Sequence, residues 1–154
     1  MKTHLVLLVI LIFAVAAGAA DINGKWLAQV TNPNGAKGER LFTFQVAGDK
    51  VTGTIANIQV AEATFEEKGK PPMTGILKTQ NTAPQAISEG KIAGDDISFA
   101  IVSQSFMGEM KTTYKGKVAG SEIKFTVEQD MGGMGGMMGG GGPGPQEIVA
   151  KKLP

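Results

Sequence analysis

The chain has 154 residues, no cysteine, and 15 lysines and arginines against 14 acidic residues, for a formal net charge of +1. This length suits a single domain with one core, and the balanced charge lacks the clustered positive surface with which nucleic-acid binders displace counterions. Without cysteine there are no disulfides, no thiolate metal sites, no cysteine nucleophile and no lipidated cysteine.

The N-terminal segment has the order of an export signal. Lys2 precedes an apolar run from Leu5 to Ala17, and small residues follow at Gly18, Ala19 and Ala20. A helix that crosses a membrane needs about 20 apolar residues, and this run is shorter, so we predict cleavage rather than anchoring. Cleavage after Ala19 or after Ala20 fits, with Ala20 preferred. The prediction is a signal peptide at 1–20 and an extracytoplasmic domain, periplasmic or secreted, at 21–154.

Removal of the signal peptide changes the chemistry of the chain. It takes away Lys2 and His4, which leaves 14 basic residues against 14 acidic ones and no histidine. Histidine is the side chain that most often shuttles protons or binds metals near neutral pH. The remaining adjacent carboxylates, Asp95-Asp96 and Glu66-Glu67, fall in a turn and a loop, where we interpret them as solvated charges. We therefore predict no enzyme activity, no cofactor and no metal site built from the usual ligands.

Most of the mature sequence alternates apolar and polar residues, which predicts half-buried antiparallel strands. In residues 110–118, for example, Tyr114 and Val118 share one face while Lys115 and Lys117 share the other. No segment after the signal has helical periodicity. The predicted strands are 24–31, 39–47, 50–57, 59–66, 73–80, 85–92, 96–103, 109–118, 121–128 and 146–152.

Glycine-centred turns join several of these strands, at Gly48, Gly94 and Gly120. Glycine accepts the positive φ angles of tight hairpin turns. Two of the turns lie in an internal repeat, because residues 90–99 align with residues 116–125 and each copy reads as one hairpin. Eight to ten short strands joined mainly by tight turns predict a single antiparallel up-and-down β-barrel, since closure removes exposed sheet edges.

Two segments interrupt the alternation. Residues 66–72 form a charged loop that ends in two prolines, and proline stops ladder pairing. Residues 131–145 are rich in glycine and methionine, a composition that predicts a flexible loop before the closing strand 146–152. Thioethers are soft ligands that suit Cu(I), so binding of this ion is one alternative function for the methionines of the loop, which are Met131, Met134, Met137 and Met138.

The first predicted strand begins Asn23-Gly24-Lys25-Trp26, and this Gly-x-Trp resembles the opening of the calycin superfamily, the lipocalins and their relatives. The resemblance implies an antiparallel barrel with the tryptophan packed across its floor and, in many members, a small apolar ligand inside. In the family an arginine stacks over the tryptophan; Arg40 is the only arginine of this chain. The repeated phrase of residues 90–99 and the ending 146–151 are also similar to small exported bacterial β-domains of unassigned function.

The inward aromatic residues lead to two functional hypotheses. In the first, the mature domain is a non-enzymatic binding module that takes a small apolar ligand inside the barrel, because barrel cavities are lined mainly by apolar side chains. Its ligand-binding residues are Trp26, Phe44, Phe99, Tyr114 and Phe125. In the second, the same rings fill the core, and the domain is structural or binds a protein partner on its surface. No nucleic acid and no membrane span after cleavage are expected.

Overall fold

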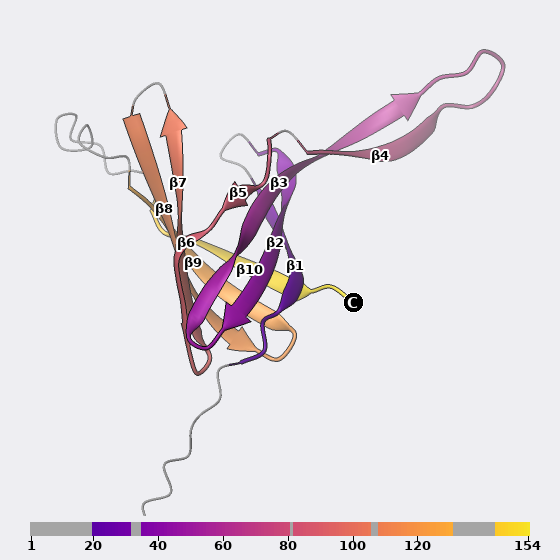
Figure 1. Cartoon of the computed structure of the whole chain (residues 1–154). Coiled ribbons are helices and arrows are strands. Elements are labelled where there is room, and N and C mark those ends of the chain that lie inside the picture. The colour runs from indigo at the N-terminus through magenta and orange to yellow at the C-terminus, as the bar shows by residue number, and fades with distance from the viewer. Residues whose placement is uncertain (1–19, 32–34, 81, 106–107, 131–143) are drawn as a thin grey trace, which may run out of the picture.

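The computed structural model describes residues 20–31, 35–80, 82–105, 108–130 and 144–154 as an all-β fold with antiparallel pairing throughout (Figure 1). No helix long and apolar enough to cross a membrane occurs among these residues. The predicted fold class is confirmed. The strands are β1 (Gly24–Thr31), β2 (Lys37–Ala47), β3 (Lys50–Phe65), β4 (Met73–Gln80), β5 (Gln85–Ala86), β6 (Ser88–Ala93), β7 (Asp96–Ser105), β8 (Gly108–Ala119), β9 (Glu122–Asp130) and β10 (Gln146–Lys152).

Eight of the strands close into a ring. Around it β1, β2, β3, β6, β7, β8, β9 and β10 follow in chain order, and β10 pairs with β1 to complete the circuit. This is the up-and-down arrangement that the alternation predicts. The other two strands lie off the ring: β4 pairs with β3 alone, and the short β5 pairs with β3 at Thr54 and Ile55.

The predicted glycine turns are confirmed as two-residue hairpin turns. Gly48, Gly94 and Gly120 have φ angles of 66°, 60° and 61°, in the left-handed region that glycine adopts without steric cost. The two copies of the internal repeat are the β6–β7 and β8–β9 hairpins.

The core fills the interior of the ring with side chains from alternate strand positions. Phe42 contacts four other aromatic side chains, with ring centroids 5.3 Å from Phe125, 5.7 Å from Phe44, 6.0 Å from Tyr114 and 6.3 Å from Phe99. These distances lie in the range of favourable aromatic pairs. Aliphatic side chains complete the packing, among them Ile22, Val51, Ile55, Ile92, Ile97, Ile123 and Ile148.

The division into strands differs from the prediction at two places, and several strand ends shift by one or two residues. Strand β3 is a single strand, so the predicted division into 50–57 and 59–66 is wrong. The consecutive burial of Ile55 and Ala56 breaks the period-two pattern, yet the ladder continues because β2 pairs with β3 as far as Gln59 and β4 pairs with it from Ile58 onward. The predicted strand 85–92 is divided into β5 and β6, with the register of the β6–β7 pair shifting between Ser88 and Lys91.

Gly116 provides a test of this packing. A Cβ atom at Gly116 would lie 2.5 Å from Cδ1 of Phe125, its partner across the β8–β9 pair. We expect Gly116→Ala to lower the free energy of unfolding by about 1–3 kcal/mol, the usual cost of overpacking. Chemical denaturation followed by the fluorescence of Trp26 measures it. Gly144→Ala is the control, because an added Cβ there has nothing within 4 Å; equal midpoints for the two variants would contradict the prediction.

Candidate functional site

The part of β3 beyond Gln59 leaves the ring together with β4. Pairing between β2 and β3 ends at Gly38↔Gln59, whereas β3 and β4 stay paired out to Phe65↔Met73. We call residues 60–80 the arm: the end of β3, the loop 66–72 and β4. Figure 1 shows the arm as a two-stranded ribbon that projects away from the ring. It is the feature of the described fold least supported by packing.

One face of the arm is apolar. Side chains of directly paired strand residues lie on the same face, so Phe65 and Met73 form one row and Ala63 and Gly75 the next. The third row pairs Ala61 with Leu77. The Phe65 ring covers Gly75, since a Cβ on that glycine would lie 3.3 Å from Cε2 of the ring. We call these six residues the apolar face.

The apolar face is exposed to solvent. Phe65, Met73 and Leu77 have exposed fractions of 51%, 66% and 49%, while Ile76, at 67%, is exposed on the opposite face, where it pairs with Glu62. Scattered apolar residues are normal on a protein surface, but a contiguous patch of them indicates an interaction site.

The apolar face continues the inner wall of the ring. Successive side chains of a strand point to opposite faces, so Val51 and Ile55 share a face of β3 with Ala61 and Phe65, and the β2 register between them contains no shift. Val51 and Ile55 are buried in the core. The same face of one strand is thus covered by the core in its first half and uncovered in its second half.

An ion pair holds the base of the arm on its other face. Nζ of Lys78 lies 2.8 Å from Oε1 and 2.9 Å from Oε2 of Glu39 on β2. Glu39 is only 9% exposed, whereas the Lys78 side chain is about half exposed. Because water screens the lysine, the pair adds modest stability, and its main effect is to fix the direction in which β4 leaves the ring.

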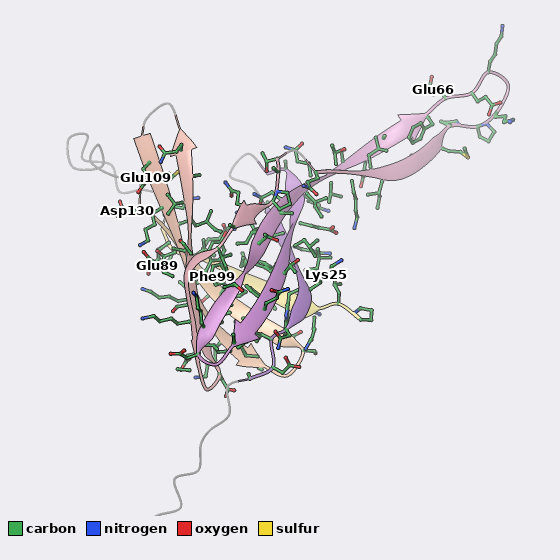
Figure 2. All side chains as sticks on the ribbon, in the orientation of Figure 1. Lys25, Glu66, Glu89, Phe99, Glu109 and Asp130 are labelled. Atoms are coloured by element: carbon green, nitrogen blue, oxygen red, sulfur yellow. The ribbon has the colours of Figure 1, made fainter. Side chains whose placement is uncertain are left out.

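The tip of the arm is charged and balanced. Glu66, Glu67, Lys68 and Lys70 are all exposed, and Nζ of Lys70 lies 2.9 Å from Glu67 (Glu66 is labelled at the tip in Figure 2). The tip therefore carries two charges of each sign and stays in water, while the apolar rows lie between it and the ring.

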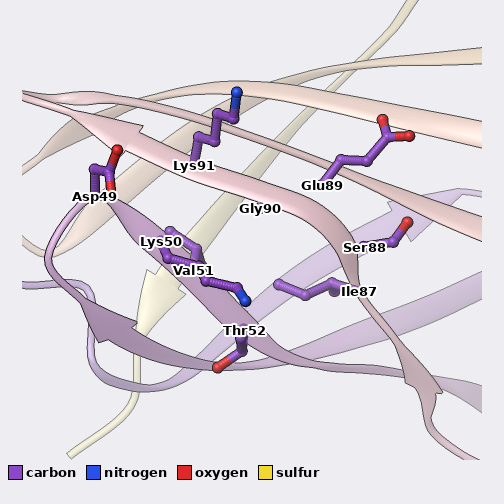
Figure 3. A pocket seen from close by; sticks show the side chains of 9 residues that line it. All are labelled: Asp49, Lys50, Val51, Thr52, Ile87, Ser88, Glu89, Gly90 and Lys91. Carbon is purple, nitrogen blue, oxygen red and sulfur yellow. The ribbon is translucent and has the colours of Figure 1, made fainter.

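A second candidate is a surface cleft of about 520 Å³ where β3 meets β6 (Figure 3). The two strands pair at Lys50↔Lys91, which places two like charges opposite each other. Glu89 has a φ of 53°, an uncommon conformation for a residue other than glycine, and its carboxylate lies 2.8 Å from Nζ of Lys111. The cleft is lined by Asp49, Lys50, Val51, Thr52, Ile87, Ser88, Glu89, Gly90 and Lys91.

The five residues predicted to bind a ligand all lie inside the ring and are buried. The structure brings four of them together: the centroid of Phe99 lies 4.8 Å from Tyr114, 5.5 Å from Phe44 and 5.7 Å from Phe125. Figure 2 shows Phe99 inside the ring. None of the five lines the cleft. Phe44, Phe99, Tyr114 and Phe125 pack against one another or against Phe42, and the apolar ligand stays a prediction.

Trp26 is fully buried in the core. Its Nε1 donates a hydrogen bond to the carbonyl of Ile22 at 2.8 Å, and the ammonium group of Lys152 lies 5.6 Å from the ring centroid. The four methionines considered for Cu(I) lie outside the described residues. The described residues also contain no group of three or more His, Asp or Glu side chains placed to hold a metal ion.

Two features of the site were not predicted from the sequence. The first is the position of the arm: its strands were predicted from the sequence, but not that they lie outside the ring. The only signal for this position was the proline-bearing loop 66–72 between the two strands. The second feature is the hydrogen bond of 3.1 Å from Nη1 of Arg40 to the hydroxyl of Tyr114, which joins residues 74 positions apart. Spacing in the sequence carries no signal for such a contact.

Comparison with known proteins gives no match to a protein-family model, to a curated protein or to a solved structure.

The Tyr114–Arg40 pair makes the stability depend on pH. Burial raises the pKa of the Tyr114 hydroxyl above 10.0, and the charge of Arg40 opposes the rise. A pKa raised by folding gives stability that is fully present below pH 10 and is lost as the pH rises through the folded-state pKa. We expect tyrosinate absorbance, from the only tyrosine, to appear above pH 10 in the folded protein, with a parallel fall in stability.

Two variants test the cause. Tyr114→Phe should remove the part of the alkaline fall in stability that comes from ionisation of Tyr114. Arg40→Gln should move the tyrosinate transition to still higher pH, because it removes the positive charge that opposes the rise of the Tyr114 pKa. Ionisation of Tyr114 at or below pH 10 in the folded wild-type protein would contradict the prediction.

Proposed function

We propose that the mature chain is an exported, non-enzymatic binding module that docks a protein partner on the apolar face of its arm. The observation that carries the proposal is the uncovered continuation of the inner wall, where Phe65 and Met73 are more than half exposed and Leu77 is 49% exposed. A two-stranded ribbon is marginally stable by itself in water, so a partner that covers this face stabilises the arm as well as binding to it.

We infer a calycin-like scaffold for the module. Its support is the ring of eight antiparallel strands in chain order, together with the Gly24-x-Trp26 motif at the start of β1 and the burial of Trp26. The cation near the tryptophan comes from Lys152 rather than from an arginine. In this proposal the ring is a rigid support for the arm.

The charges of the arm favour a protein over an anionic membrane or a nucleic acid as the partner. The arm carries Glu62, Glu66 and Glu67 against Lys68, Lys70 and Lys78, so it is formally neutral. Anionic bilayers and nucleic acids attract clustered basic residues. An apolar face without charged side chains, with the charges on the opposite face and at the tip, instead suits the apolar centre of a protein interface.

Site-specific photo-cross-linking tests the docking surface. We expect benzoylphenylalanine in place of Leu77, on the apolar face, to form an adduct of defined mass in cells that export the protein. The matched control is Thr74, on the same strand but the opposite face. Absence of an adduct at Leu77, or equal adducts at both positions, would overturn the proposal.

Export makes a separate prediction about processing. The backbone nitrogen of Ala20 donates a hydrogen bond to the carbonyl of Gly94 at 3.0 Å, and Ala20 packs against the core. Cleavage after Ala19 retains this donor as a charged amine, which strengthens the bond, whereas cleavage after Ala20 removes it. The sequence pattern alone prefers cleavage after Ala20; this bond instead favours cleavage after Ala19, so we expect the mature chain to begin at Ala20.

The intact mass and N-terminal sequence of the exported protein measure the cleavage position. A mature chain that begins at Asp21 would contradict the contribution of the Ala20 bond. A chain that keeps its first 19 residues would contradict the proposed export.

A further inference from the structure

We propose that the end of the ring at Arg40 binds a small organic monocarboxylate, whose carboxylate group pairs with the Arg40 guanidinium. The inference goes beyond the proposed function, because it concerns the interior of the ring and not the arm. Three observations carry it: a cation that points into the ring without an acidic partner, a hydroxyl group beside that cation, and a wall of partly buried side chains beyond both.

Arg40 reaches across the interior of the ring. Alternate residues of a strand share a face, so Arg40 lies on the same face of β2 as Phe42 and Phe44, which are buried in the core. Its Nη1 donates a hydrogen bond of 3.1 Å to the hydroxyl of Tyr114 on β8. Three strands separate β2 from β8 in either direction around the ring, so the two strands lie on opposite sides of it. The guanidinium group therefore lies inside the ring, next to the aromatic core.

The positive charge of Arg40 has no counter-ion within the described part of the chain. None of the ion pairs found there includes it. Its neighbours on the two adjacent strands, Ala28 on β1 and Asn57 on β3, are uncharged. Glu39, the next residue on β2, points to the other face and binds Lys78. Arg40 is partly buried, and a charge removed from water without a partner is costly, so an anion that binds here supplies an interaction that the folded chain lacks.

The Tyr114 hydroxyl group is placed to contact the same anion. It accepts the bond from Arg40 and donates none of the hydrogen bonds found among the described residues, so its proton is available to an acceptor beside the guanidinium. The guanidinium group is a planar fork of N–H donors that matches the two oxygens of a carboxylate, and Tyr114 takes up only one side of it. The pair thus offers a carboxylate both a charge and directed donors.

Solvent reaches the inside of the ring at this end. Thr112 and Met110 follow Tyr114 on the inner face of β8, and Val30 lies on the inner face of β1. All three are only partly buried, as is Arg40 itself, whereas the aromatic residues of the core are almost completely buried. A small ligand therefore has access to Arg40 from this end of the ring.

The charge and the wall select the class of ligand. Arg40 supplies one positive charge, so it neutralises a monoanion, whereas a dianion such as a phosphate monoester would keep uncompensated charge inside the ring. Met110 and Val30 give the wall apolar surface, which favours a ligand with an apolar group attached to its anionic head. A small carboxylic acid with an apolar tail meets both requirements.

NMR titration of the exported, processed protein with octanoate tests the inference. The neutral control ligand is octanamide, which has the same length. Arg40 is the only arginine, so the Nε–Hε signal of arginine in the isotope-labelled protein reports on this site alone. We expect octanoate at up to about 10 mM to shift this signal to saturation and octanamide to leave it in place. No shift with octanoate, or equal shifts with the two ligands, would overturn the inference.

Two variants that each remove one positive charge test whether binding depends on Arg40. Arg40→Gln changes the site, whereas Lys124→Gln changes an exposed lysine of β9 that lies between the buried residues Ile123 and Phe125 and so points away from the core. In isothermal titration calorimetry, Arg40→Gln should bind octanoate about tenfold more weakly than the wild type, the loss of one charge-assisted hydrogen bond, and Lys124→Gln should bind like the wild type. Unchanged affinity in Arg40→Gln, or equal losses in both variants, would overturn the inference.

Tyr114→Phe tests the site without removing a charge. It keeps the aromatic ring in the core and removes only the hydroxyl group, so the variant is expected to fold, which its unfolding midpoint measures together with that of Arg40→Gln. We expect it to bind octanoate several-fold more weakly than the wild type, because one donor to the carboxylate is lost. Wild-type affinity in a folded Tyr114→Phe would overturn the placement of the carboxylate between the two side chains.

Discussion

The alternation of side chains along β3 is the constraint on which the rest of the structure depends. Val51 and Ile55 anchor one face of this strand in the core, and the unbroken register with β2 and then with β4 carries that face out to Phe65. A change of register by one residue would exchange the two faces and turn Thr64 and Glu62 to the inner side. The position of the apolar face is therefore fixed by the same residues that fix the core.

The sequence was sufficient for the fold class because the evidence for it is local. Period-two alternation and the glycines of the hairpin turns each act over a few residues, and the turns at Gly48, Gly94 and Gly120 formed as expected. The sequence was insufficient where one strand has two different environments. Nothing in residues 59–66 distinguishes a strand that closes a ring from one that leaves it, because both alternate in the same way.

The candidate site shows the same limit. The alternation correctly placed the aromatic residues inside the ring of strands. Whether their side chains surround a cavity or fill the interior depends on how they pack against one another, which the alternation does not specify. Phe42, which the alternation also turns inward but which is not among the five predicted ligand-binding residues, contacts four of the other aromatic side chains. The pairing of Arg40 with Tyr114 likewise depends on the closure of the ring rather than on spacing along the chain.

The joint between β3 and β6 is the shortest in the wall of the ring. The ring is completed there by the pair Lys50↔Lys91 and by backbone bonds from Ile87 to Gly53 and from Ile92 to Asp49. Every other joint of the ring has a longer ladder. Since β3 also continues into the arm, the strand that carries the apolar face is also the strand at which a single registered residue pair closes the wall.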